Sequence, residues 1–472
     1  MSLYPVDQTK GRKKAAVLTL GCKVNQFESA AMVRMLERQG YTPAGRDQPA
    51  DLTVVNTCTV THRADVEAGT IIRRAYRLNP QGRILVTGCL AQTRPAEMAA
   101  LPGVTLVLGQ NYKADFLTFF EDSNRGGTKV DPPGRDRKIL DLGYPRFDRT
   151  RAFFRLQDGC SARCSYCIVP LARGPSRSLE PESVLEGLDH YAREGYEEVV
   201  LTGIHLGAWG LDLRPPTSLT SLIVQAEAQP NLSRLRLSSI EPNEVTPGLR
   251  ELSSGSSRLC PHLHLPLQSG SDRILAAMRR PYTADLFRRL VLELKAGRED
   301  ICLGADVLVG FPGEDQEAFL ETYRLVEELP LSYLHVFRYS RRPGTTAEAM
   351  PDQTPQEEKK RRVAALRRLG ESKRLHFYRR SLGRVRPTLV ENTPDRQTGL
   401  ARGLTNNYIP VLITEPAFPA GLGHASRVTS AAQAGHGHAE VRLRRTQAGR
   451  LLPVRLVELT SGGRVLGRPE QL

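Results

Sequence analysis

The chain has 472 residues, enough for two to four domains of about 100 to 200 residues each. Its formal net charge of +15 favours a polyanionic partner, with nucleic acid as the leading candidate. The eight cysteines form no dense secreted framework, the polar start lacks a signal-peptide core, and no apolar run approaches the roughly 18 residues that span a bilayer, so we expect a cytoplasmic protein without a membrane segment.

Short apolar runs alternate with helix-like stretches over residues 14–118. Strands are expected at residues 15–20, 52–55 and 84–86, and helices at residues 28–39 and 66–78. This alternation predicts a parallel α/β domain. Residues 119–150 are rich in Gly, Pro, Asp and Arg and lack apolar periodicity, so we interpret them as a linker.

A second alternation runs over residues 151–380 and predicts a full or partial (β/α) barrel of about six units. Its expected strands are residues 199–202, 234–240, 262–267, 304–309 and 333–337, and helices are expected at 182–194 and 314–328. The domain ends in a long helix over residues 356–381 that is dominated by lysine and arginine. A solvated face and a nucleic-acid contact both fit that charge.

The last expected domain, residues 381–460, consists of short β-like runs broken by turn residues, which predicts a small β-barrel. These runs are residues 385–390, 408–413, 439–443 and 451–459. Residues 415–438 are rich in Gly, Ala, Pro and His and read as a loop insertion with little apolar area to bury. Its histidines, His424, His436 and His438, could bind a metal, but simple solvated polarity is the favoured interpretation.

Cys160, Cys164 and Cys167 place three thiols within eight residues. Cysteine thiolates are the usual ligands of iron–sulfur clusters, and three of them leave one iron of a four-iron cluster open to another ligand. Structural zinc is the alternative, but it requires four closed ligands and no partner pair follows Cys167. Arg163 and Arg173 make the segment electropositive, which favours thiolates over inert buried thiols.

Cys22, Cys58 and Cys89 each follow an expected strand of the first domain. The carboxyl ends of parallel strands lie at one edge of a sheet, so the sequence predicts that these three cysteines converge into a second three-thiolate site. Independent core cysteines are the alternative interpretation. Cys260 and Cys302 stand beside apolar strand residues, and we assign them to the core.

The C-x3-C-x2-C spacing, with Tyr166 before its third cysteine, resembles the cluster loop of radical S-adenosylmethionine enzymes. With the second cysteine set and the C-terminal barrel, nearly the whole chain resembles the methylthiotransferase family, and the C-terminal barrel resembles its TRAM RNA-binding domain. Sequence segments similar to motifs of this family lie at residues 20–26, 265–271 and 306–314. The chain departs from the family's pattern by the insertion at residues 415–438, so the sequence does not define where the small barrel begins and ends.

This resemblance implies two [4Fe–4S] clusters and S-adenosylmethionine as cofactors, with an electron donor protein and a sulfur donor as further partners. The radical cluster would be held by Cys160, Cys164 and Cys167, and the auxiliary cluster by Cys22, Cys58 and Cys89. The candidate contacts of S-adenosylmethionine lie at or beyond strand ends of the barrel: Gly203, His205, Ser238, Glu241 and Gln268. His205 fits a packing role equally well.

Members of the family act on tRNA adenosine carrying a threonylcarbamoyl or an isopentenyl group, or on an aspartate of a ribosomal protein. The phrase at residues 21–26 is most similar to the threonylcarbamoyl branch, which implies methylthiolation at C2 of N6-threonylcarbamoyladenosine beside the anticodon. That substrate carries a carboxylate, so Arg163 and Arg173 are candidates for binding it. A noncatalytic iron–sulfur RNA-binding protein would explain the charge and the cysteines, but not the barrel.

Overall fold

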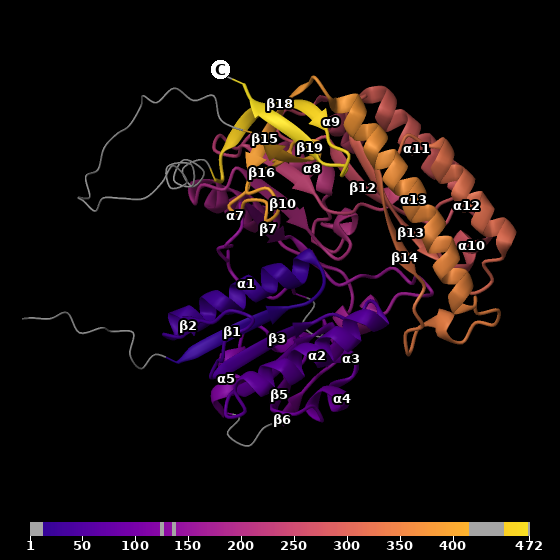
Figure 1. The fold of residues 1–472 in the computed structure, drawn as a ribbon. Helices are drawn as coiled ribbons and strands as arrows, with labels where there is room; N and C mark the ends of the chain where they lie inside the picture. Colours follow the sequence, from indigo (N-terminus) through magenta and orange to yellow (C-terminus); the bar gives the residue numbers. More distant parts are fainter. Residues whose placement is uncertain (1–12, 123–126, 135–137, 415–447, 471–472) are drawn as a thin grey trace, which may run out of the picture.

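The computed structural model describes residues 13–122, 127–134, 138–414 and 448–470 (Figure 1). The residues 415–438, with their three histidines, and the expected strand at 439–443 lie outside the described residues. The architecture is mixed α/β, as the sequence predicts: a parallel sheet domain, an open barrel and a small closed β-barrel. No helix in the described part of the chain is long and apolar enough to cross a membrane.

The N-terminal domain is a six-stranded parallel sheet in the order β2-β1-β3-β4-β5-β6. Its strands are β1 (Lys14–Thr19), β2 (Thr42–Pro43), β3 (Leu52–Thr57), β4 (Arg83–Gly88), β5 (Val104–Leu108) and β6 (Gly127–Lys129). Its helices are α1 (Lys23–Arg38), α2 (His62–Leu78), α3 (Cys89–Thr93), α4 (Pro95–Ala99) and α5 (Phe116–Asp122). Separate apolar cores cover the two faces of the sheet, which is why its central strands read as continuous apolar runs. The sheet reaches Lys129, beyond the expected boundary at residue 118.

Six parallel strands form the open barrel, in the order β7-β10-β11-β12-β13-β14. They are β7 (Arg151–Arg155), β10 (Glu198–Thr202), β11 (Arg234–Leu237), β12 (His262–Gln268), β13 (Cys302–Val309) and β14 (Tyr333–Arg338). A parallel bridge between Ser239 and His264 joins the two halves. No pairing between β7 and β14 exists among the described residues, so the barrel is partial and has one open side.

Helices cover the outside of this barrel (Figure 1). They are α7 (Pro181–Arg193), α8 (Leu219–Glu227), α9 (Pro247–Gly255), α10 (Asp272–Ala277), α11 (Ala284–Gly297), α12 (Gln316–Glu328) and α13 (Gln356–Ser381). Alternate strand residues, such as Leu263 and Leu265, join the apolar core beneath the helices. Their neighbours His262 and His264 therefore face the lumen, because successive side chains of a strand point to opposite faces.

The N-terminal domain lies across the open side of the barrel, from one edge strand to the other (Figure 1). At the first edge, Phe27 of α1 packs with Phe154 of β7, with ring centroids 6.4 Å apart. At the other edge, Arg342, which follows β14, pairs with Asp65 of α2 at 2.7 Å and donates to the Thr59 carbonyl oxygen at 3.0 Å. The carboxyl edge of the N-terminal sheet is thereby brought against the barrel.

The C-terminal domain is a closed five-stranded barrel. It consists of β15 (Val385–Val390), β16 (Ala401–Thr405), β17 (Pro410–Ile413), β18 (Leu451–Leu459) and β19 (Val465–Pro469), and it extends past the expected end at residue 460. It lies on the side of the molecule opposite the N-terminal domain (Figure 1).

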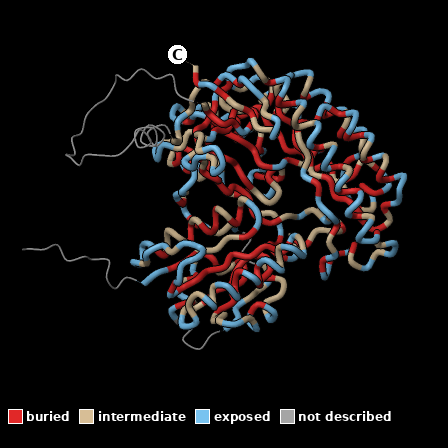
Figure 2. Tube along the Cα trace, viewed as in Figure 1, coloured by how far each residue is buried: buried red, intermediate tan, exposed pale blue. Residues whose placement is uncertain are grey.

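Buried arginines join this small barrel to β11. Arg234 donates to the Leu404 carbonyl oxygen at 3.1 Å, and Arg236 donates to the Thr405 carbonyl oxygen at 3.2 Å. Glu198 of β10 is fully buried and pairs with both arginines. The junction is part of the buried interior of the protein (Figure 2).

Candidate active site

The three cysteines of the N-terminal domain stand at the carboxyl ends of three adjacent strands. Cys22 immediately precedes α1, Cys58 follows β3, and Cys89 is the first residue of α3. The backbone between them is tight, since a Cβ atom on Gly21, whose φ is +96°, would lie 2.9 Å from the Cys58 sulfur. Burial raises the pKa of Cys58 to about 12, and the neighbouring Cys89 and Cys22 add to this. A positively charged partner such as a metal cluster would offset that cost of forming thiolates.

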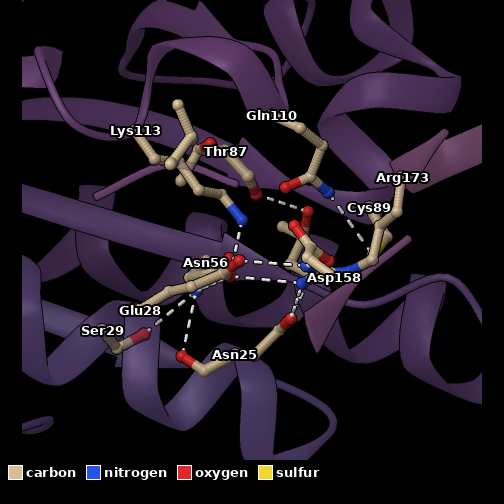
Figure 3. A network of polar contacts seen from close by, with 12 residues as sticks. Asn25, Glu28, Ser29, Asn56, Thr87, Cys89, Gln110, Lys113, Asp158 and Arg173 are labelled. Carbon is tan, nitrogen blue, oxygen red and sulfur yellow. Dashed lines mark hydrogen bonds and ion pairs between the residues drawn. The ribbon is translucent and has the colours of Figure 1, made fainter. Parts of the chain in front are cut away.

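A buried ionic network lies beside these cysteines (Figure 3). Arg173 contacts Glu28 at 3.0 Å, Asp158 at 2.7 Å and the side-chain oxygen of Asn25 at 2.6 Å. Lys113 contacts Glu28 at 2.6 Å. Burial alone would raise the pKa of Glu28, but Arg173 and Lys113 hold it well below its usual range. Glu28 is therefore ionised, and through Arg173 it joins the N-terminal domain to the barrel.

The same network reaches the cysteines through amide side chains. Asn25 donates to the carbonyl oxygens of Leu20 at 2.7 Å and Thr57 at 3.0 Å, and Gln110 lies 3.6 Å from the Cys89 sulfur. These contacts fix the segments that carry the thiols, in the manner of the outer shell of a metal site. Sequence reasoning missed Glu28, Lys113, Asn25 and Gln110 because their types are ordinary and only the fold brings them together.

The second cysteine set lies between β8 (Gln157–Asp158) and α6 (Val169–Arg173). The Cys160 N–H donates to the Gly174 carbonyl oxygen at 2.9 Å, which ties the start of the loop to its end. His205 Nδ1 lies 3.4 Å from the Cys160 sulfur, and Arg280 donates to the Cys164 sulfur at 3.2 Å. Sequence reasoning missed Arg280, which is 116 residues from Cys164 in the chain.

Both cysteine sets fit a cluster better than a single ion. All eight cysteines are free thiols. Within the described ranges, His264, Asp306 and His335 form a group of metal-binding side chains whose ligand atoms all lie within 4.8 Å of one another. Neither cysteine set is gathered as closely as this. Each set offers three thiols, one fewer than a closed structural zinc site needs, whereas a four-iron cluster can accept three thiolates and leave one iron for another ligand.

Comparison with known proteins agrees with this geometry. Residues 14–109 match the uncharacterized protein family UPF0004, and residues 154–326 match the radical SAM superfamily. The threonylcarbamoyladenosine tRNA methylthiotransferase MtaB of Bacillus subtilis is 38% identical over 401 residues, covering 84% of this chain and 89% of the relative. The chain belongs to the radical S-adenosylmethionine tRNA methylthiotransferase family.

Two further similarities show how far the likeness extends. The tRNA-2-methylthio-N(6)-dimethylallyladenosine synthase of Syntrophobacter fumaroxidans is 34% identical, covering 85% of this chain and 91% of the relative. The radical S-adenosylmethionine methyltransferase TsrM of Kitasatospora setae, solved with cobalamin and a [4Fe-4S] cluster, has a TM-score of 0.54 at 17% identity. It covers 71% of this chain and 77% of its own, and at that identity it shows the fold alone.

In this methylthiotransferase, two of the residues expected to contact S-adenosylmethionine are tied to the loop Cys160–Cys167, His205 directly and Glu241 through Arg280. The His205 N–H donates to the Gln157 side chain at 2.7 Å, and a Cβ atom on Gly203 would lie 2.8 Å from the same Gln157 oxygen. Glu241 pairs with Arg280, and Gln268 ends β12 with a φ of +63°. Ser238 is buried, and its hydroxyl has no hydrogen-bond partner among the residues that the structure describes.

The two arginines expected at the substrate lie in very different surroundings. Arg163 is exposed, and its guanidinium makes no hydrogen bond or ion pair with any residue that the structure describes. Arg173 is fully buried and engaged by Glu28, Asp158 and Asn25. Its donors serve the ionic network, so we do not retain it as a candidate for the substrate carboxylate.

Proposed function

We propose that this chain adds a methylthio group to C2 of N6-threonylcarbamoyladenosine in tRNA, beside the anticodon, in the reducing cytoplasm. The observation that carries the proposal is the pair of three-cysteine sites, which come from two domains and meet where the N-terminal domain closes the open barrel. Similarity to relatives named for that substrate supports the choice of branch.

In this proposal the cysteines hold two [4Fe–4S] clusters, the auxiliary one at Cys22, Cys58 and Cys89. When bound, the clusters and S-adenosylmethionine supply the radical, the methyl group and the sulfur. The residues of the chain orient these groups and exclude water: Gln157 fixes the backbone of His205, and Arg280 positions Glu241 and Cys164. An electron donor protein and a sulfur donor are separate partners.

We place the tRNA backbone in a basic groove that is lined by residues of the N-terminal domain and of the barrel. It has a volume of about 730 Å³ and runs between the start of α2, the segment after β14 and the start of α13. Its lining contains no acidic residue, and its arginines and lysine are Arg63, Arg338, Arg341, Arg342, Lys359 and Arg367, of which Arg342 is paired with Asp65. Phe337 is 45% exposed at this groove and offers a ring for a base to stack on.

Two other basic surfaces carry less free charge than the sequence indicates. On α13, Lys360 and Arg361 pair with Glu357 and Glu358. On the C-terminal barrel, Arg386 pairs with Asp300. Acidic neighbours offset part of their attraction for RNA, which favours the groove as the main electrostatic contact.

The proposal is tested by nucleoside mass spectrometry of tRNA from cells that lack this protein. We expect 2-methylthio-N6-threonylcarbamoyladenosine to disappear and its unmethylthiolated precursor to accumulate, with restoration by the wild-type chain. Loss of the isopentenyl counterpart instead would assign the chain to the other tRNA branch, and unchanged tRNA would point to the ribosomal-protein branch. Release of 5′-deoxyadenosine by the reconstituted protein would separate all three from a noncatalytic RNA-binding role.

A further inference from the structure

The inner face of the open barrel is unusually polar. His264 of β12, Asp306 of β13 and His335 of β14 meet there: His264 Nε2 lies 2.8 Å and His335 Nδ1 lies 3.4 Å from the same Asp306 oxygen. His264 Nδ1 is also 3.0 Å from the Tyr333 hydroxyl. Two imidazoles therefore occupy one oxygen of Asp306 and hold the carboxylate against the β12 and β14 side of the lumen.

Lys23 enters the same lumen from the N-terminal domain. It is the first residue of α1, directly after Cys22, and the charges of Arg151, Arg236 and Asp306 act on it. Arg151 lies 3.6 Å and Arg236 lies 2.8 Å from Glu198, so both guanidiniums have a carboxylate partner. Lys23 is half-buried yet makes no hydrogen bond or ion pair with another residue in the described ranges. Burial, Arg151 and Arg236 lower the pKa of Lys23, so its charged form lacks a direct partner and would be stabilised by an anion placed against it.

A divalent metal ion is the rival occupant of this cluster, because two histidines and one carboxylate form a common transition-metal site. The surroundings oppose it. The site has one carboxylate, already bonded to two imidazoles, and Lys23, which has no carboxylate partner, acts on it, whereas Arg151 and Arg236 are paired with Glu198. A further double positive charge would be repelled, whereas an anion would be attracted and would give Lys23 its missing partner.

We infer that Lys23 binds the carboxylate of the threonylcarbamoyl group; this inference rests on the proposed function. C2 and the N6 substituent flank the same ring nitrogen of adenine. A base whose C2 faces the auxiliary cysteines therefore carries its substituent close to those cysteines, and Lys23 directly follows one of them, Cys22. An ammonium on a flexible stem in a half-buried site suits a single carboxylate. An isopentenyl substituent has no charge and gains nothing from Lys23.

The test compares two synthetic anticodon stem-loops, one with N6-threonylcarbamoyladenosine and one with its methyl ester, which lacks the charge. With the reconstituted enzyme, K23M should lower kcat/KM for the acid about 10- to 100-fold, because charged hydrogen bonds contribute on that scale, and should leave the ester unchanged. K23R, which keeps the charge, should retain most of the activity on the acid. K129M is the matched control, since Lys129 is exposed on the edge strand β6, and should behave as wild type.

Iron and sulfide content, together with 5′-deoxyadenosine release without RNA, must be equal in K23M and wild type, which separates charge recognition from damage at Cys22. Equal losses on acid and ester, or no loss on either, would overturn the inference. The inference would also be overturned if X-ray absorption found one zinc ion per chain with only nitrogen and oxygen neighbours, and if H335A lost that ion. Such a result would show that His264, Asp306 and His335 bind a metal. If the wild type modifies neither stem-loop but modifies an isopentenyl one, the proposed function itself has failed.

Discussion

At the scale of single residues, two arginines of similar sequence context have opposite environments. Both lie near the cysteine loop, and the sequence gives no sign of the difference. Arg173 is buried because Glu28, which lies 145 positions earlier in the chain, faces it across the domain junction. Arg163 has no such partner among the described residues and stays in solvent. Long-range partners of this kind are not encoded in local pattern.

This difference predicts opposite effects of substitution. R173M leaves Glu28 and Asp158 buried without their guanidinium, which should lower the free energy of unfolding by about 3–5 kcal/mol. It should also reduce the iron bound per chain, because Arg173 steadies Asn25 beside Cys22. R163M, in the same segment, should change stability by less than about 0.5 kcal/mol. Thermal unfolding and iron analysis measure both effects, and full iron content in R173M would contradict this account.

At the scale of elements, the junction between β10, β11 and the C-terminal barrel depends on one carboxylate. Glu198 is fully buried, and Arg236 and Arg234 lower its pKa although burial alone would raise it. The sequence shows only an ordinary Glu at the start of a strand. Around it, His262 stacks on Tyr408 of the small barrel with ring centroids 4.2 Å apart. The small barrel is therefore part of the folded core and not merely an appended module.

E198Q should lower the free energy of unfolding at pH 7 by about 3–5 kcal/mol, because two buried arginines lose their carboxylate. The pKa of Glu198 is depressed in the folded state, so its contribution is present above the unfolded-state pKa of about 4.3 and is lost as the pH falls below that value. The stability difference between wild type and E198Q should therefore narrow below about pH 4. Chemical unfolding at pH 7 and below about pH 4 measures this stability difference, and E194Q, at the exposed end of α7, is the control. A difference independent of pH would count against an ionised Glu198.

At the scale of the whole molecule, the order of the three domains and many of their strands follow from periodicity. The strand expected at residues 385–390 and the helix at 356–381 have the bounds that the structure gives them. By contrast, β6, β16 and β19 were missed, since their short Gly-rich or Arg-rich runs carry no apolar alternation, and β5 and β7 were missed although their runs are apolar. The sequence was sufficient to predict that Cys22, Cys58 and Cys89 each follow a strand. The packing of one domain across the open side of another was not, because it depends on side chains far apart in sequence.

The groove that we assign to tRNA gives a prediction at this scale, since three segments from two domains build it. R338Q combined with R341Q should weaken tRNA binding and reduce the slope of log Kd against log salt by about 1 to 2. Both side chains are exposed and lie beyond the cysteine sets, so the iron content should not change. R289Q on α11, whose side chain is 66% exposed on the outer surface, is the control. An unaltered salt dependence in the double variant would remove the groove from the docking site.

The ionic junction at Arg173 also bears on how the protein is made. A ribosome completes residues 14–129, and with them all three cysteines of the first site, before residue 173 exists. During that interval Lys113 is present for Glu28, but the guanidinium that bonds Glu28, Asn25 and Asp158 is not. The environment of Cys22 and Cys89 is complete only after the first strand of the barrel and its cysteine loop have been synthesised and have folded against α1. The side chains that surround the earlier cysteines in the folded protein are thus all present only after the later segment has been translated.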